Sequence, residues 1–268
     1  MDKTKTLSLG QIQSEEIRLL NEFVSICHQY GLRYYLAYGA VLGAIRHDGP
    51  IPWDDDIDLY MPRPDFDRLI ALTPASVDCK LLDVNAPDYA WYGVGKFVST
   101  RTQFSEPDLV CPEDYGVFLD IFPLDGVRAD NAKKLYGLHR VVRKLEKIGY
   151  HFDSKNTTLS GGGLLLRKVF GGFARLAPMS RYRKLLWKIE HTVDFSEAEY
   201  LVNFSSVYSL EKELKEPNCC DGDLVGYSGK AYFTVKNPEG YLCQVYGQNW
   251  RTPIKREEPS HGRAEWRA

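Results

Sequence analysis

Residues 54–58 read Asp-Asp-Asp-Ile-Asp, so four carboxylates fall within five positions. Ionised carboxylates this close repel one another and titrate as a coupled group. The apolar residues Trp53, Ile57 and Leu59 flank and interrupt the cluster, which is unusual for a merely solvated acidic loop. A chain that folds with this much negative charge beside apolar residues needs a cation at the cluster, and this requirement constrains the fold most strongly.

Successive side chains of a strand point to opposite faces, which predicts where each of these acids points. Residues 57–61 are predicted to form a strand, so Asp56 and Asp58 project from one face, and Asp55 has the opposite parity. Asp54 is expected in the preceding turn, as a candidate ligand or general base. We expect Asp55 to matter least for function.

A third acid is predicted to join Asp56 and Asp58. Residues 116–124, GVFLDIFPL, form a nearly continuous apolar run that is typical of a central strand covered on both faces. Asp120 interrupts this run, and a lone buried acid is costly unless it is paired or binds a metal. Carboxylate oxygens are the ligands that hard divalent cations prefer. We therefore predict that Asp56, Asp58 and Asp120 bind Mg²⁺ or Mn²⁺.

Apolar spacing and turn residues predict the remaining elements. A first helix is expected over 8–30, with Ser8 and Gln11 as a capping box and Gly31 as the C-terminal cap. The other expected helices are 40–46, 64–72, 130–149, 179–193 and 238–246. The expected strands are 33–38, 57–61, 81–84, 92–99, 103–106, 116–124 and 232–235, and a polar tail ends the chain.

Several function classes are disfavoured by composition. The 268 residues include 44% hydrophobic and 26% charged residues, as expected for a globular protein. No run of 18 apolar residues and no secretory signal are visible, so a cytoplasmic location is expected. The six cysteines form no C-x-x-C pair, which disfavours structural zinc.

Charge divides the chain into an acidic and a basic part. Residues 48–125 carry sixteen acids and five bases, whereas residues 133–188 carry fourteen bases and two acids. We predict a catalytic core over 1–129, a basic helical region over 130–195, and C-terminal elements over 196–268 that complete the core. Residues 153–163 are predicted to be a flexible, glycine-rich linker.

A phosphate-bearing ligand fits the predicted metal site, because Mg²⁺ held by carboxylates keeps positions for substrate phosphates. The turn at Gly39 and Ala40 is predicted to place glycine backbone and a helix start against phosphates. Arg46 and Lys96 are candidates for contact with the phosphate charge, and Trp53 is predicted to belong to the same ligand-binding site. A calcium loop is disfavoured because Tyr60 and prolines follow where such a loop needs glycine and glutamate.

The stretch YGAVLGAIRHDGPIPWDDDIDLYMPRPDF resembles the signature of the LicD family, which includes phosphorylcholine transferases and fukutin-related ribitol-phosphate transferases. The family belongs to the nucleotidyltransferase superfamily, and Gly39, the Asp56–Leu59 element and Asp120 match the outline of that superfamily. Ala40 stands where the superfamily often has serine. The resemblance covers about residues 12–125 well and the C-terminal third loosely.

The resemblance implies an α+β fold, with a nucleotidyltransferase-like mixed β-sheet core flanked by helices and a basic helical insertion. It also implies transfer of a phosphoalcohol, phosphocholine first, from a CDP-activated donor to a sugar hydroxyl. The acceptor would be a surface polysaccharide, lipopolysaccharide, capsule or teichoic-acid precursor, and CMP would be released. Asp120 or Asp54 would accept the hydroxyl proton.

Two alternatives stay open: a nucleotidyltransferase that moves NMP from an NTP, and an inactive carbohydrate-binding relative. The basic region mixes Leu, Phe and Trp with Arg and Lys, so it is a candidate for contact with an anionic membrane that presents a lipid-linked glycan. A solvated helix pair packed on the acidic core explains the same pattern. Nucleic acid is not expected, since no recognised binding motif accompanies the charge.

Overall fold

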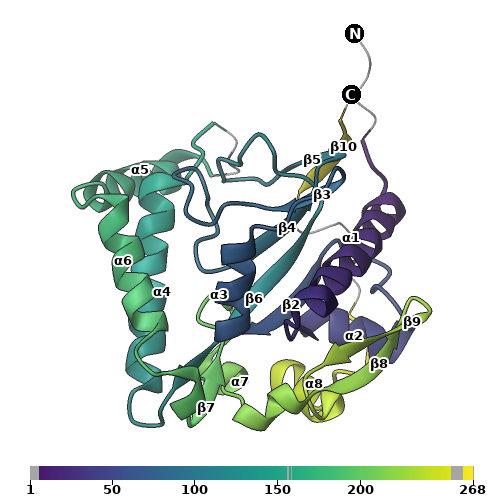
Figure 1. Cartoon of the computed structure of the whole chain (residues 1–268). Coiled ribbons are helices and arrows are strands. Elements are labelled where there is room, and N and C mark those ends of the chain that lie inside the picture. The colour runs from purple at the N-terminus through teal and green to yellow at the C-terminus, as the bar shows by residue number, and fades with distance from the viewer. Residues whose placement is uncertain (1–5, 156, 158, 255–261, 268) are drawn as a thin grey trace.

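The structure is a computed structural model, and it describes residues 6–155, 157, 159–254 and 262–267. In this part of the chain, an eight-stranded mixed sheet lies at the centre, with strand order β3-β4-β6-β2-β1-β9-β8 and β7 paired with the end of β6. Helices flank the sheet (Figure 1), so the α+β class is confirmed. The strands are β1 (Tyr35–Leu36), β2 (Ile57–Pro62), β3 (Cys79–Leu81), β4 (Gly95–Ser99), β5 (Thr102–Ser105), β6 (Phe118–Val127), β7 (Tyr200–Val202), β8 (Asp223–Tyr227), β9 (Lys230–Thr234) and β10 (Arg263–Trp266).

Helices cover the sheet and build a separate layer at one side of it (Figure 1). Their bounds are α1 (Leu9–Tyr30), α2 (Tyr38–His47), α3 (Arg63–Leu72), α4 (Ala132–Tyr150), α5 (Gly161–Ala174), α6 (Met179–Glu190), α7 (Leu210–Glu213) and α8 (Pro238–Tyr246). The first helix has the predicted ends: the Ser8 side chain accepts from the Gln11 amide, the Gln11 side chain accepts from the Ser8 amide, and Gly31 has a left-handed φ of 60°.

The centre of the sheet is the parallel pair β2 and β6, which confirms that the run 116–124 contains a central strand, although this strand begins at Phe118 and continues to Val127. One face of this pair carries Leu119 and Ile121, which lie on the side of α1 and α3. Phe23 of α1 contacts Phe97, the antiparallel partner of Leu119, with ring centres 5.6 Å apart. The other face carries Asp58 and Asp120, so apolar helices bury one face and leave the acids on the opposite one.

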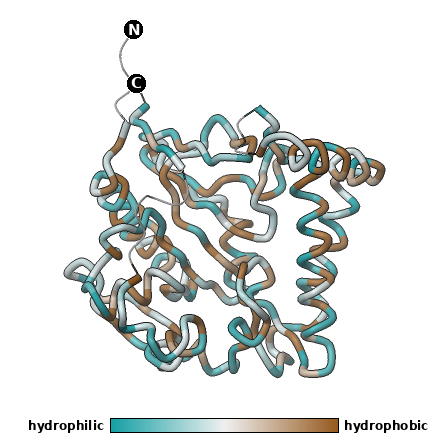
Figure 2. The backbone as a smooth tube through the Cα atoms, turned by 180° about the vertical axis from the view of Figure 1, so that it is seen from behind, coloured by the Kyte–Doolittle hydropathy of each residue, from teal (hydrophilic) through white to brown (hydrophobic). Residues whose placement is uncertain are grey.

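Helices α4, α5 and α6 form the side layer, within the predicted basic region 130–195 (Figure 1). Within this layer, the buried carboxylate of Glu146 on α4 contacts His151 and Arg183 of α6. Arg183 also donates hydrogen bonds to the backbone carbonyls of residues 85, 86 and 89. A small apolar cluster that includes Val127, Tyr136 and Phe204 fills the junction between the layer and the end of β6. Figure 2 shows hydrophobic residues running through the central strands and along the helical layer.

Several sequence-based boundaries are corrected by the structure. The strand expected over 33–38 is limited to Tyr35–Leu36, and the helix expected over 40–46 begins already at Tyr38, so Gly39 lies in the first helical turn. Gly161–Gly163, expected in a flexible linker, form the first turn of α5. Arg263–Trp266, expected in a polar tail, pair with β5 as β10.

Within the described residues, we find no helix with the length and apolar character that a membrane crossing requires.

Candidate active site

The first turn of α2 lies directly against Asp54. A Cβ atom built on Gly39 would stand 2.8 Å from Asp54 Oδ2, closer than side-chain atoms normally approach. Asp54 therefore occupies space that any other residue at position 39 would fill. The amides of Tyr38 and Ala40 already donate to the Tyr241 hydroxyl and to the Ala37 carbonyl, so the helix start offers fewer donors for phosphate than the sequence suggests.

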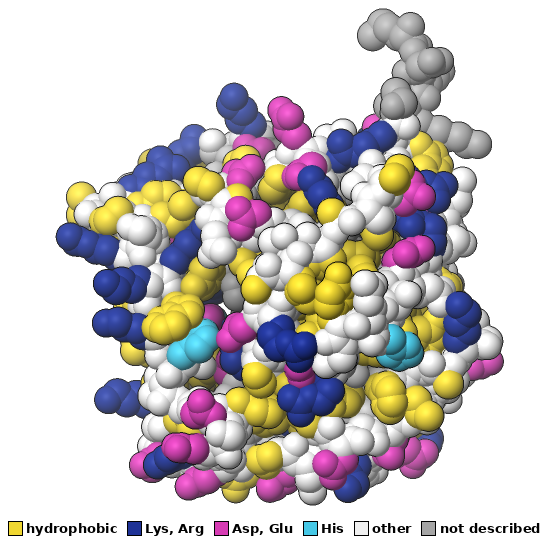
Figure 3. Space-filling view, in the orientation of Figure 1, with side chains coloured by type: hydrophobic (Ala, Val, Ile, Leu, Met, Phe, Trp, Pro, Cys, Tyr) yellow, Lys and Arg dark blue, Asp and Glu magenta, His cyan; other side chains and the backbone are white. Residues whose placement is uncertain are grey.

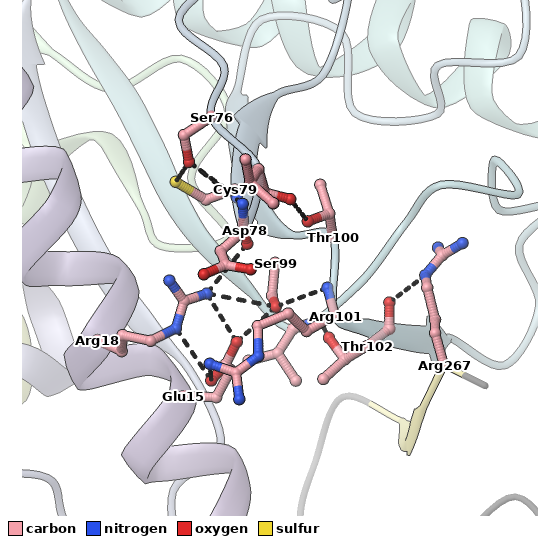
Figure 4. Close-up of polar contacts among 12 residues, drawn as sticks. Glu15, Arg18, Ser76, Asp78, Cys79, Ser99, Thr100, Arg101, Thr102 and Arg267 are labelled. Atoms are coloured by element: carbon pink, nitrogen blue, oxygen red, sulfur yellow. Dashed lines mark hydrogen bonds and ion pairs between the residues drawn. The ribbon is translucent and has the colours of Figure 1, made fainter.

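A side chain of α1 holds the turn that carries Asp54. Gln13 Nε2 donates to the carbonyl oxygens of Ile51 and Asp54, at 3.0 and 2.8 Å. Neighbouring Glu15 fixes this helix to the sheet, because its carboxylate contacts Arg18 and accepts from Ser99 at the end of β4 (Figure 4). The acidic turn is thus positioned by hydrogen bonds from a buried, anchored helix.

The parallel register of β2 and β6 sets Asp58 beside Asp120. Lys96 is the antiparallel partner of Asp120 on the other side, and its ammonium lies 2.7 Å from Asp120 Oδ1. The Lys96 side chain is buried, with its ammonium 3.6 Å from the centre of the Phe118 ring. The sheet therefore brings two predicted metal ligands together, and it holds one of them with a buried cation.

A cavity of about 490 Å³ opens over these residues. Asp54, Asp56, Asp58 and Asp120 all line it, whereas Asp55 is buried and does not. This arrangement agrees with the alternation expected from the sequence. Three of the five residues predicted to bind the phosphate-bearing ligand, Gly39, Arg46 and Trp53, line the cavity. The other two, Ala40 and Lys96, are buried and do not line it.

The electrostatics of the cavity favour a divalent cation. Burial raises the pKa of Asp58 well above its ordinary range, and the charges of Asp56, Asp120 and Asp54 raise it further. Carboxylate oxygens of Asp54, Asp55 and Asp56 lie within 4.8 Å of one another. Closely spaced carboxylates are what Mg²⁺ or Mn²⁺ binds in proteins, so the acidic turn fits such an ion. Asp55 belongs to this cluster but does not line the cavity, so the candidate ligands on the cavity side are Asp54, Asp56, Asp58 and Asp120.

Arg46 is the basic residue among the described residues that line the cavity. Its Nη1 donates to the carbonyl oxygen of Trp250 at 3.0 Å, which fixes the side chain across the end of α2. Trp53 packs edge-on against His47, with ring centres 6.1 Å apart. These residues form the side of the cavity next to the acidic turn.

Sequence reasoning missed one more carboxyl group near the cluster. Glu16 of α1 is buried, and its pKa is raised well above the ordinary range, first by burial and then by the charges of Asp56, Asp55 and Asp54. A signal for it was present, since Glu16 lies at helical spacing from Ile12 and Leu20 on the apolar face of α1.

Residues distant in sequence complete the cavity and were also missed. Tyr208, Tyr246 and Trp250 supply aromatic rings, and Asn203, Ser205 and Ser206 supply polar groups; nearer to the acids in sequence, Tyr38 and Phe122 add two further rings. The chain returns to the sheet through β7 and α8, and the sequence pattern contains no cue for that return.

Comparison with known proteins agrees with this geometry. Residues 31–145 match the family model described as LicD/FKTN/FKRP, nucleotidyltransferase domain. The matched segment contains α2, β2 and β6, and with them all four acids that line the cavity. The resemblance to the LicD family that was read from the acidic motif is therefore confirmed over this segment.

A characterised relative extends over nearly the whole chain. The lipopolysaccharide cholinephosphotransferase LicD of Haemophilus influenzae is 25% identical over 263 residues, which cover 96% of this chain and 97% of the relative. Uncharacterized proteins of Rickettsia prowazekii and Rickettsia typhi match shorter segments. They are 34% identical over 70 residues and 36% identical over 59 residues, or 26% and 22% of this chain and 24% and 17% of the relatives.

Proposed function

We propose that this protein transfers phosphocholine from CDP-choline to a sugar hydroxyl of a cell-surface glycan, such as lipopolysaccharide or a teichoic-acid precursor, and releases CMP. The observation that carries the proposal is the cavity in which Asp58 and Asp120 pair across two central strands beside Asp54 and Asp56. The full-length similarity to a lipopolysaccharide cholinephosphotransferase supports the choice of alcohol and acceptor.

The proposed reaction is displacement at the phosphorus that carries choline. The acceptor oxygen forms a bond to this phosphorus, the bond to the bridging oxygen breaks, and the electron pair leaves with CMP. When bound by Asp56, Asp58 and Asp120, Mg²⁺ or Mn²⁺ would neutralise charge on the diphosphate oxygens and ease that departure. Arg46 adds a fixed positive charge on the neighbouring side of the cavity.

A cavity carboxylate takes the proton of the acceptor hydroxyl. Asp54 and Asp120 are the two candidates, and their surroundings differ: Asp120 contacts the Lys96 ammonium, whereas Asp54 lies against Gly39. A proton acceptor and a metal ligand respond differently to asparagine. Loss of the acceptor removes the acidic limb of the profile of kcat against pH, whereas loss of a ligand raises the Mg²⁺ concentration needed for activity.

Product analysis tests the proposal against a nucleotidyltransferase reaction, which the family description also names. The protein is incubated with Mg²⁺ and a lipopolysaccharide acceptor, and with CDP-choline, CDP-glycerol, CDP-ribitol or CTP. We expect CMP and a phosphocholine-bearing glycan from CDP-choline. Pyrophosphate from CTP would instead establish NMP transfer, and no product from any donor with folded, Mg²⁺-binding protein would support an inactive relative.

Variants link the product to the cavity. Asp58→Asn is expected to lower CMP release by at least about 100-fold, as for loss of a group that stabilises transition-state charge. Asp88→Asn removes an exposed acid outside the cavity and serves as the matched control. Equal activity of both variants would refute the assignment of Asp58.

We further propose that the acceptor reaches the enzyme at an anionic membrane surface, through α5. This helix exposes apolar side chains at helical spacing, among them Leu166, Phe170 and Phe173, and Phe173 is 66% exposed. Lysines and arginines border these side chains along the edge formed by α5 and α6 (Figure 3). Apolar residues bordered by bases are typical of helices that lie on anionic lipid.

A cavity beside α5 suits an anionic headgroup. It has a volume of about 320 Å³ and lies between α4 and α5, where Lys144, Lys147 and Arg167 line it together with Leu166 and Phe170. The charges of Arg143, Lys96 and Arg167 lower the pKa of Lys147 after burial, its main cause. A phosphate here would relieve repulsion among these bases.

Vesicle sedimentation tests this contact. We expect the protein to sediment with vesicles of phosphatidylglycerol and phosphatidylcholine at low salt, and to stay in the supernatant with phosphatidylcholine alone. The double variant Phe170→Ser, Phe173→Ser should lose binding, and Val77→Ser, at a 91% exposed residue outside α5, should keep it. Dimerisation that disappears in the double variant, without vesicle binding, would identify a second copy as the occupant instead.

A further inference from the structure

The cavity that holds the four acids has an aromatic half. Tyr60 and Phe122 are register partners two residues beyond the partners Asp58 and Asp120, so they lie on the same face of the sheet. A step of two residues along a strand is about 6.6 Å. An aromatic row therefore lies one pleat repeat from the carboxylate row.

Three more rings, from other parts of the chain, join this row. Tyr38 meets Phe122 edge-on at 5.9 Å and stacks on Tyr208 at 5.5 Å, and Tyr208 meets Tyr246 at 6.1 Å with an angle of 88°. Phe122, Tyr208 and Tyr246 are each partly exposed and line the cavity. We call Tyr38, Phe122, Tyr208 and Tyr246 the aromatic wall.

Charge on the cavity surface favours a cationic group at this wall. Among the described residues that line the cavity, four aspartates face a single basic residue, Arg46, which is held by Trp250. Tyr246 is close enough to Asp58 that the Asp58 charge contributes to raising the pKa of its hydroxyl, after burial and neighbouring tyrosines. A cation at the wall gains from both the ring faces and the aspartates.

We infer that the aromatic wall binds the quaternary ammonium of the choline group and thereby selects choline over neutral alcohols. This inference rests on the proposed function for the donor, and it assigns the specificity to Phe122, Tyr208 and Tyr246. Methylated ammonium groups offer no hydrogen-bond donor, so ring faces are the protein groups that recognise them.

Bond connectivity decides between choline and the cytosine base as the occupant. In CDP-choline the ammonium is two carbons from a phosphate oxygen, whereas the base lies beyond a complete ribose. With the diphosphate at the carboxylate row, an aromatic row one pleat repeat away matches the short choline arm. A neutral base would also lack the charge–charge attraction to the neighbouring aspartates that the choline ammonium gains.

One ring of the wall already lies beside a cation. The Lys212 ammonium is 5.4 Å from the centre of the Tyr208 ring, and Lys212 does not line the cavity.

Calorimetric titration of the whole chain with Mg²⁺ present tests the inference without requiring turnover. The probes are phosphocholine, its uncharged carbon isostere 3,3-dimethylbutyl phosphate, and CMP. We expect phosphocholine to bind about tenfold more tightly than the isostere, in the range of a desolvated cation–π contact. Tyr208→Leu should abolish this preference, Tyr208→Phe should keep it, and all variants should bind CMP equally.

A matched control is Tyr30→Leu, which changes a 41% exposed tyrosine at the end of α1. Equal binding of phosphocholine and the isostere by the unmodified protein, or no binding of phosphocholine, would overturn the inference. A parallel loss of CMP affinity in Tyr208→Leu would assign the wall to cytosine and overturn it too. If phosphocholine is preferred while no CDP-alcohol yields CMP, the inference stands and the proposed function fails.

Discussion

Gly39→Ala is expected to displace the Asp54 carboxylate while it changes the stability of the fold little. The new Cβ would stand 2.8 Å from Asp54 Oδ2, whereas ordinary contacts begin at 3.4 Å. The carboxylate must therefore move by about 0.6 Å, the difference between these distances. Gly39 does not have a positive φ, so alanine fits the backbone of the first turn of α2.

The two effects of this substitution have different magnitudes. A misplacement of about 1 Å in a catalytic group can cost about 100-fold in rate, so a shift of about 0.6 Å should lower kcat by roughly tenfold. Alanine is favoured over glycine in helices by up to about 1 kcal/mol, which offsets the small cost of moving a flexible side chain. The free energy of unfolding should therefore change by less than about 1 kcal/mol.

Gly10→Ala is the matched control, because Gly10 is the second residue of α1 as Gly39 is of α2, and nothing lies within 4 Å of its added Cβ. The assays are CMP release from CDP-choline and urea unfolding followed by circular dichroism. Gly10→Ala should keep full activity. Full activity in Gly39→Ala, or a loss of activity that follows a loss of folded protein, would refute the reasoning.

Three further predictions follow from the site and the helical layer. Asp55 lies outside the cavity, so Asp55→Asn should keep kcat within about threefold of the unmodified protein, whereas Asp58→Asn should lower it by at least about 100-fold. Equal losses of CMP release in the two variants would show that the strand register is irrelevant. EDTA should abolish activity, and excess Mg²⁺ should restore it. Mg²⁺ at 100 times its Kd should stabilise the fold of the unmodified protein by about 2.7 kcal/mol in thermal unfolding, and this stabilisation should be absent in Asp58→Asn. Burial raises the pKa of Glu146, but the hydrogen bond with His151 and the charge of Arg143 outweigh it and leave the pKa lowered. The stability contributed by ionised Glu146 is therefore complete above the ordinary glutamate pKa and is lost as pH falls through the lowered value, so Glu146→Gln should cost about 3 kcal/mol in urea unfolding at pH 7 and progressively less as the pH is lowered through that range.

Elements with local signals were predictable from the sequence. The capping box and cap glycine give the ends of α1, the apolar run gives β6, and Pro238 at the first position gives the start of α8. Asp58 was predictable because alternation along β2 turns it away from Ile57 and Leu59, whereas Asp54, Asp55 and Asp56 lie in the turn before β2. These residues carry their information within a few positions of the chain.

The remaining features depend on tertiary contacts. The helix α2 begins at Tyr38, although Tyr38 has a positive φ, because its amide donates to the Tyr241 hydroxyl and its ring packs on Tyr60. Lys96 was expected at phosphate, but the antiparallel register of β4 with β6 places it beside Asp120 instead. No local pattern encodes which strand a segment will pair with.

The division of the cavity between sequence segments has a consequence for specificity. The four acids lie inside residues 31–145, the segment that matches the nucleotidyltransferase family model, whereas Tyr208 and Tyr246 lie outside it. The chain leaves the sheet through the helical layer and returns at β7; Tyr208 follows β7, and Tyr246 is the last residue of α8. Proteins that share the matched segment alone can therefore keep the same acids while they present a different wall to the alcohol. On this reasoning, the proposed metal ligands and two rings of the wall, Tyr38 and Phe122, belong to the shared segment, whereas the other two rings, and with them part of the choice of alcohol, belong to the part of the chain that follows the basic helices.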